Sequence, residues 1–79
     1  MNKYEIIPHL YLNNQPEFSD RMEALAADYI AEQELNLEVV DLWNDATAEQ
    51  SCEQLEIAQE NNSLFYADEF FFWLVQDMI

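Results

Sequence analysis

The chain has 79 residues, of which 51% are hydrophobic and 14% aromatic, and its 17 acidic and two basic side chains give a formal net charge of -15. A chain of this length and apolar content can bury one core, so we expect a single domain over residues 1–79 and exclude a disordered acidic tail. The lack of any glycine excludes glycine-rich phosphate loops, and a lone cysteine excludes an internal disulfide or a zinc–thiolate cluster.

The first segment with a structural signal is Tyr4–Leu12, which is rich in aromatic and β-branched residues. Such residues favour strands. Pro8 interrupts the segment and has no N–H to donate to a neighbouring strand. The sequence therefore predicts an edge strand, or a strand with a bulge at the proline.

The strongest helical pattern runs from Pro16 to about Gln33. Proline suits the first turn of a helix, and Glu17 complements the positive N-terminal dipole. Six apolar residues recur at helical spacing and define one buried face: Phe18, Met22, Leu25, Ala26, Tyr29 and Ile30. We expect an amphipathic helix whose opposite half carries acidic residues.

The segment Leu35–Trp43 alternates at first and then becomes continuously apolar at Val39-Val40. This pattern predicts a central, mostly buried strand. Asn44-Asp45 provides the turn that ends it.

A second helix is predicted to follow, with Thr47 and Gln50 forming a capping box at its start. Its apolar face is thin and consists of Ala48, Cys52 and Leu55, so we expect it to lie on the surface. Four carboxylates fall on one narrow stripe of this helix: Glu49, Glu53, Glu56 and Glu60. Each pair of like charges at this spacing costs about 0.2–0.5 kcal/mol of helix stability.

The last segment, Ser63–Ile79, permits two interpretations after a short strand at Leu64–Tyr66. Asp68 can begin a helix, or Asp68-Glu69 can form a hairpin turn before a second strand over Phe70–Val75. The apolar spacing favours the helix, whereas the aromatic content favours the strand. We adopt the helix, which gives the order β-α-β-α-β-α: an α+β fold with a small sheet of about three strands and two or three helices packed on it.

The sequence does not indicate an enzyme, a cofactor or a metal site. His9 is the only histidine and has no neighbouring nucleophile, so we expect a structural or surface role for it. Cys52 is predicted to be a small apolar filler. No signal peptide is recognisable, and the longest apolar run, Phe70–Val75, is too short to cross a membrane. We expect a cytoplasmic protein.

The charge pattern is the main functional signal. A surface this negative is repelled by nucleic acid. Carboxylates four residues apart on a helix lie about 6 Å apart, a spacing comparable to that of phosphates along a strand. The predicted partner is therefore a basic groove that normally holds nucleic acid. The predicted contact residues are the four glutamates of the stripe, Glu49, Glu53, Glu56 and Glu60, and a second patch of Glu17, Asp20, Glu23 and Asp28.

Aromatic residues are frequent binding anchors, which makes Trp43, Tyr66 and Trp73 candidates. We expect the two tryptophans to be buried in the core instead.

In size, charge and acidic helix faces, the chain resembles small phage-encoded inhibitors that mimic DNA, a class that includes anti-CRISPR proteins, anti-restriction proteins and uracil-DNA glycosylase inhibitors. The resemblance implies a stoichiometric inhibitor that blocks the nucleic-acid site of its target. Among these groups, the length and expected α+β fold are most similar to anti-CRISPR proteins.

Three alternatives stay open at this point. An immunity protein or antitoxin that neutralises a basic toxin would use the same surface. A small oligomeric adaptor would instead pair with a copy of itself, as a homodimer, through its aromatic segment Phe70–Trp73. Finally, the acidity can serve solubility or a salt-rich environment alone.

Overall fold

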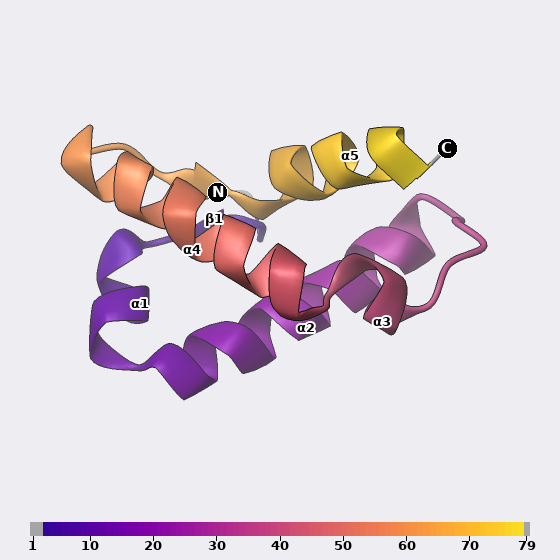
Figure 1. The fold of residues 1–79 in the computed structure, drawn as a ribbon, viewed down its shortest axis with the longest axis horizontal. Coiled ribbons are helices and arrows are strands. Elements are labelled where there is room, and N and C mark those ends of the chain that lie inside the picture. The colour runs from indigo at the N-terminus through magenta and orange to yellow at the C-terminus, as the bar shows by residue number, and fades with distance from the viewer. Residues whose placement is uncertain (1–2, 79) are drawn as a thin grey trace.

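The computed structural model describes residues 3–78, apart from the side chains of His9, Leu10 and Leu12. Helices account for most of this range, with two very short strands between them (Figure 1). The elements are β1 (Glu5–Ile6), α1 (Pro8–Asn13), α2 (Gln15–Glu32), α3 (Val39–Leu42), α4 (Asp45–Glu60), β2 (Phe65–Tyr66) and α5 (Ala67–Met78). The predicted α+β fold with a sheet of about three strands is therefore wrong.

The two strands form one antiparallel ladder that joins distant parts of the chain. Glu5 is opposite Tyr66, and Ile6 is opposite Phe65. The pairing continues past the strands, because the backbone N–H of Ala67 donates to the carbonyl of Tyr4 at 3.0 Å. The ladder thus holds the N-terminal segment against the start of α5.

The predicted strand Tyr4–Leu12 is wrong except at Glu5 and Ile6. Only Glu5–Ile6 pairs as a strand, and Pro8 begins helix α1. A proline at the first helical position loses nothing, because that N–H has no partner within the helix. The side-chain amide of Gln59 donates to the Pro8 carbonyl at 3.0 Å and fixes α1 against α4.

The predicted central strand Leu35–Trp43 is also wrong. Val39–Leu42 forms the single-turn helix α3, whose start is closed by the Asp41 carboxylate accepting from the Glu38 N–H at 2.8 Å. Leu42 and Trp43 are buried from this turn. Strand-forming residues need a neighbouring strand to pair with. The one-turn helix places Leu42 and Trp43 in the core without one and leaves Val40 63% exposed, so the segment is not mostly buried as predicted.

Helix α2 confirms the predicted amphipathic helix, with Pro16 in its first turn. It ends in a Schellman motif, in which the N–H of Leu35 donates to the carbonyl of Ile30 at 3.0 Å. The motif requires a left-handed residue, and Glu34 occupies that position with a φ of 53°. Glycine usually fills such positions, and this chain has none.

Helix α4 begins one turn earlier than predicted. Its N-cap is Asn44, whose side-chain oxygen accepts from the Thr47 N–H at 3.0 Å, so the predicted Thr47–Gln50 capping box is wrong. Asparagine caps helices at least as well as threonine. Thr47 is buried, and α4 ends with Asn62 in the left-handed region at a φ of 54°.

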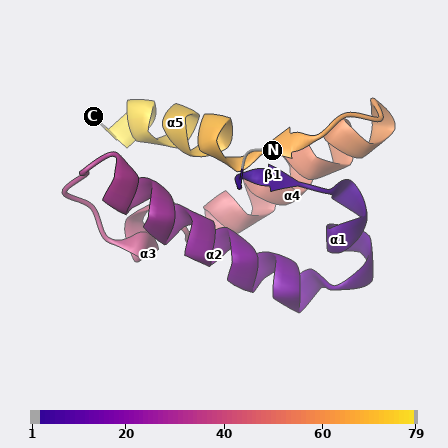
Figure 2. The ribbon, with the colours of Figure 1, turned by 180° about the vertical axis from the view of Figure 1, so that it is seen from behind.

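The described residues share one hydrophobic core between α2 and α4, closed by α5 and the ladder. Helix α4 lies in front in Figure 1, and α2 lies in front in the reverse view of Figure 2, so the two helices flank the core from opposite sides. The largest fully buried apolar side chains are Phe18, Phe71, Ile6, Met22, Leu42 and Leu55. Within residues 3–78, no helix has the length and apolar character needed to cross a membrane.

Candidate functional site

The predicted glutamate stripe is a continuous exposed row on α4. Its four carboxylate residues, Glu49, Glu53, Glu56 and Glu60, are all exposed. They occupy about 60° of the helix circumference, opposite the buried Ser51 and Leu55. The row is about 16 Å long at the α-helical rise, nearly half the 34 Å length of the molecule.

Both basic side chains of the chain are used away from this stripe. Lys3 pairs with Glu32 and lies 3.9 Å from Asp28. Arg21 donates to the backbone carbonyl of Glu5 at 3.2 Å. Among the residues that the structure describes, no ion pair involves the stripe, so no described cation neutralises its charge.

The second predicted patch lies on α2 and differs in arrangement. Its members, Glu17, Asp20, Glu23 and Asp28, are all exposed. They spread over about 140° of the helix circumference, because their spacing does not follow the helical repeat. Arg21 lies one turn after Glu17, and Lys3 lies beside Asp28. Because α2 and α4 flank the core from opposite sides, the patch and the stripe do not form one surface (Figures 1 and 2).

The end of α2 carries a hydrogen-bonded cluster that fixes the N-terminal segment. The Tyr4 hydroxyl donates to the Glu32 carboxylate at 2.6 Å, and Lys3 pairs with the same carboxylate. The hydrogen bonds from Lys3 and Tyr4 lower the pKa of Glu32. Burial of its ring and the Glu32 carboxylate raise the pKa of Tyr4. Lys3, the one lysine of the chain, therefore has a structural role.

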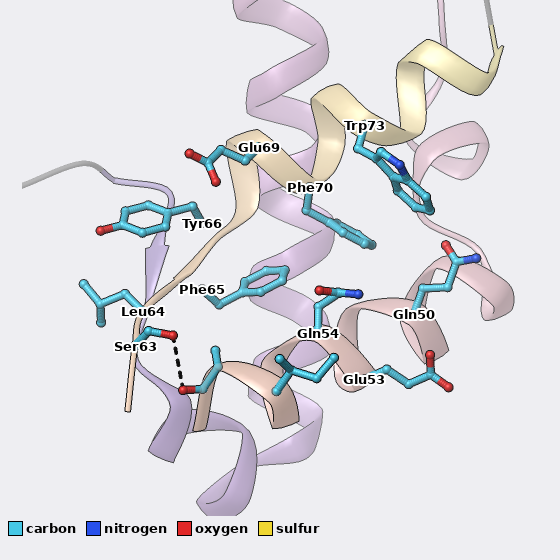
Figure 3. A pocket seen from close by; sticks show the side chains of 12 residues that line it. Gln50, Glu53, Gln54, Ser63, Leu64, Phe65, Tyr66, Glu69, Phe70 and Trp73 are labelled. Atoms are coloured by element: carbon cyan, nitrogen blue, oxygen red, sulfur yellow. Dashed lines mark hydrogen bonds between the residues drawn. The ribbon is translucent and has the colours of Figure 1, made fainter. Parts of the chain in front are cut away.

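A groove between α4 and α5 adjoins the stripe, and the sequence analysis did not predict it (Figure 3). Its volume is about 650 Å³, within the usual range of ligand sites. Phe65 and Phe70 form its floor, with ring centroids 5.6 Å apart. Ile57 lines the α4 side. The signal that could have predicted it is Ile57, an apolar residue one turn after Glu53 on an otherwise polar face.

The three candidate aromatic anchors have different environments. Trp43 is 8% exposed and belongs to the core, as predicted. Trp73 is 51% exposed, so the prediction that both tryptophans are buried is wrong. Its ring stacks on Phe70 at a centroid distance of 6.4 Å and lines the groove. Tyr66 also lines the groove and is 37% exposed. Helix α5 has more large apolar residues than its buried face can hold, which leaves Trp73 outside.

Of the two residues considered for catalysis, only Cys52 has a described side chain, and it does not line the groove. Cys52 is half-buried beside Tyr11, and burial raises the pKa of its thiol, which keeps it protonated at neutral pH. The negative charge that Cys52 carries once it ionises at alkaline pH is the main cause that raises the pKa of Tyr11. The His9 side chain lies outside the described residues. Within residues 3–78, no three His, Cys, Asp or Glu side chains form a group that could hold a metal ion.

Comparisons with protein-family models, with curated proteins and with solved structures found no match to this chain.

Proposed function

We propose that this protein is a stoichiometric inhibitor that occupies the basic nucleic-acid groove of a partner protein and excludes the nucleic acid. The target class is a CRISPR effector complex, a restriction or repair enzyme, or another nucleic-acid-binding protein of the cytoplasm, as in a phage anti-defence protein. Such an inhibitor acts by occupying the groove and uses no catalytic group and no cofactor.

The observation that supports it best is the unneutralised stripe on α4. A chain that retained four aligned glutamates for solubility alone would gain as much from dispersed or mixed charges. Here the row is narrow, straight and free of ion pairs among the described residues, while the two cations lie near α2 and β1. In a groove lined by lysine and arginine, this row of carboxylates would take the place of the bound nucleic acid.

Long-range attraction makes such an inhibitor effective. The net charge of -15 favours rapid association with a positive surface at low ionic strength. Because the α2 patch faces away from the stripe, it contributes to this general attraction and not to the contact itself. The proposed contact residues are Glu49, Glu53, Glu56 and Glu60.

The test is competition against labelled DNA on a panel of these target classes, with two charge-matched variants. In the first, the four stripe glutamates are changed to lysine. In the second, Glu17, Asp20, Glu23 and Asp28 are changed to lysine, which gives the same net charge. We expect the wild type to displace DNA at one-to-one stoichiometry from at least one target. The stripe variant should lose this activity and the α2 variant should keep most of it. Equal loss from both variants would mean that inhibition depends only on the net charge, and would contradict the assignment of the stripe as the contact surface.

One observation favours a second candidate, the oligomeric adaptor. Phe72 and Trp73 are 57% and 51% exposed on α5, which gives a copy of the chain an apolar surface to contact. Mutual repulsion at -15 opposes such a dimer at low salt. Sedimentation at increasing salt distinguishes the two: a dimer that strengthens with salt and binds no basic protein supports the adaptor.

A further inference from the structure

The groove between α4 and α5 brings an apolar surface directly beside the glutamate stripe. Glu53 belongs to both, because it is a member of the stripe and also lines the groove. On the other side of the groove, Glu69 of α5 lines the rim. Figure 3 shows these two carboxylates at opposite edges, with the rings of Phe65 and Phe70 between them. The groove is therefore apolar in its middle and acidic at its margins.

The apolar part of the groove is accessible. Trp73 and Ile57 are about half exposed, at 51% and 48%, and Leu64 is 40% exposed. Beneath them, Phe65 and Phe70 are buried and packed into the core, so the floor is held in place. A contiguous exposed apolar surface with a preformed floor is typical of a binding site.

The charges at the margins decide which occupant the groove suits. A second copy of the chain carries the same net charge of -15 and would be repelled. A neutral apolar ligand would leave the margin carboxylates without a partner. A cationic segment with an apolar side suits both the acidic margins and the apolar middle. Its lysines or arginines would contact Glu53, Glu69 and the stripe, and its apolar side chains would enter the groove.

We infer that the groove binds a short basic amphipathic segment of the partner protein, with at least one large apolar side chain between lysines or arginines. This inference rests on the proposed function and deepens it by adding an anchor to the charged contact. The stripe accelerates association, which depends on charge, and the anchored side chain slows dissociation, which depends on buried apolar contact.

The experiment uses two synthetic helix-forming peptides as probes. Each has about 14 residues, or about four helical turns. One has lysines along one side and leucines along the other, and the second has the same lysines with every leucine replaced by glutamine. Binding to the full chain is measured by isothermal titration and by the fluorescence of the tryptophans. We expect the leucine peptide to bind at least about tenfold more tightly, as expected for apolar groups entering a hydrophobic pocket. We also expect it to retain more of its affinity when salt is raised to about 0.5 M.

A matched pair of variants locates the contact. Trp73→Ala removes a groove residue, whereas Phe72→Ala removes an equally exposed aromatic residue of the same helix that does not line the groove. We expect Trp73→Ala to abolish the advantage of the leucine peptide and Phe72→Ala to retain it. Circular dichroism confirms folding. If Trp73→Ala fails to fold, Ile57→Gln removes the opposite wall at an exposed position of α4.

Equal affinity for the two peptides, or equal effects of Trp73→Ala and Phe72→Ala, would overturn the inference. So would a dimer that Trp73→Ala dissociates, because the groove would then hold a second copy. Each of these results leaves the proposed function intact if the wild type still displaces DNA and the stripe variant does not. Failure of DNA displacement, with the leucine peptide still preferred, would instead reject the proposed function alone.

Discussion

Helices α2 and α4 are built from similar parts but present different surfaces. Each contributes fully buried side chains to the same core, and each exposes four carboxylates that the sequence marked as candidates. On α4 the acids repeat every three or four residues and form one row. On α2 their spacing is irregular, and Arg21 and Lys3 lie among them. The two helices therefore differ in the alignment of their acidic residues and in the position of the few cations, and not in the number of candidate carboxylates.

The largest expected effect tests whether the two helices are equal in the core. Met22 of α2 and Leu55 of α4 are both fully buried. We expect Met22→Ala and Leu55→Ala each to lower the free energy of unfolding by about 2–5 kcal/mol, because each leaves a cavity in a packed interior. Urea unfolding measures both. A much smaller loss for one variant would mean that its helix is only loosely packed on the core. The surfaces of the two helices could then not be compared as parts of one rigid domain.

The helix starts should differ by a smaller amount. Asn44 caps α4 through its side chain, whereas Asn14, the corresponding residue of α2, makes no side-chain capping bond. We expect Asn44→Ala to cost about 1 kcal/mol of unfolding free energy. Asn14→Ala should cost less than about 0.5 kcal/mol, as for an ordinary surface change. Thermal or urea unfolding of the two variants provides the measurement, and equal costs would contradict the assigned caps.

The helix ends should differ in the opposite direction. Helix α4 also ends in a Schellman motif, in which the N–H of Ser63 donates to the carbonyl of Ala58 at 2.8 Å. Neither motif contains glycine, and the left-handed positions hold Glu34 after α2 and Asn62 after α4. Asparagine tolerates this conformation better than glutamate. We therefore expect Glu34→Gly to stabilise the protein by about 0.5 kcal/mol, and Asn62→Gly to stabilise it less. Glu34→Gln is the control, because it removes the same charge without relieving the backbone. If Glu34→Gln stabilises as much as Glu34→Gly, charge and not backbone conformation is the cause.

The smallest expected effect concerns pH and the cluster at the end of α2. The pKa of Glu32 is lowered in the folded state, so its contribution is present above the unfolded value of about 4.3 and is lost as the pH falls through the folded value. We expect Glu32→Gln to destabilise the protein at pH 7, and the difference from the wild type to shrink as the pH falls below about 4. Unfolding curves at several pH values measure this difference. A difference that is constant with pH would show that the ionised carboxylate is not what matters.

Sequence periodicity predicted α2, α4 and α5 because each has an apolar face that repeats at the helical spacing. The strands were predicted from residue type alone, and here the prediction failed at Tyr4–Leu12 and Leu35–Trp43. β-propensity reflects packing against neighbouring strands, and no local pattern reveals that a chain lacks them. Pro8 shows the same limit, since proline suits both an edge strand and the first turn of a helix.

The candidate site was predictable in part. The exposure of the stripe follows from the position of its glutamates opposite Leu55, and the structure places all four outside. Ile57 could have indicated an apolar patch on the outside of α4, but the shape of the groove was not predictable, because it depends on how α4 and α5 approach each other. The exposure of Trp73 was not predictable either. An aromatic run such as Phe70–Trp73 suggests burial, but consecutive residues point to different sides of a helix, so they cannot all face the core.

The ladder between β1 and β2 affects the order in which the chain folds. Glu5 and Ile6 find their partners only at Tyr66 and Phe65, some sixty positions further along the chain. Glu5 and Ile6 therefore cannot pair until the segment that contains Phe65 and Tyr66 has been made and has folded back onto them. Contacts of such long sequence separation slow folding, so we expect the ladder to close late in folding.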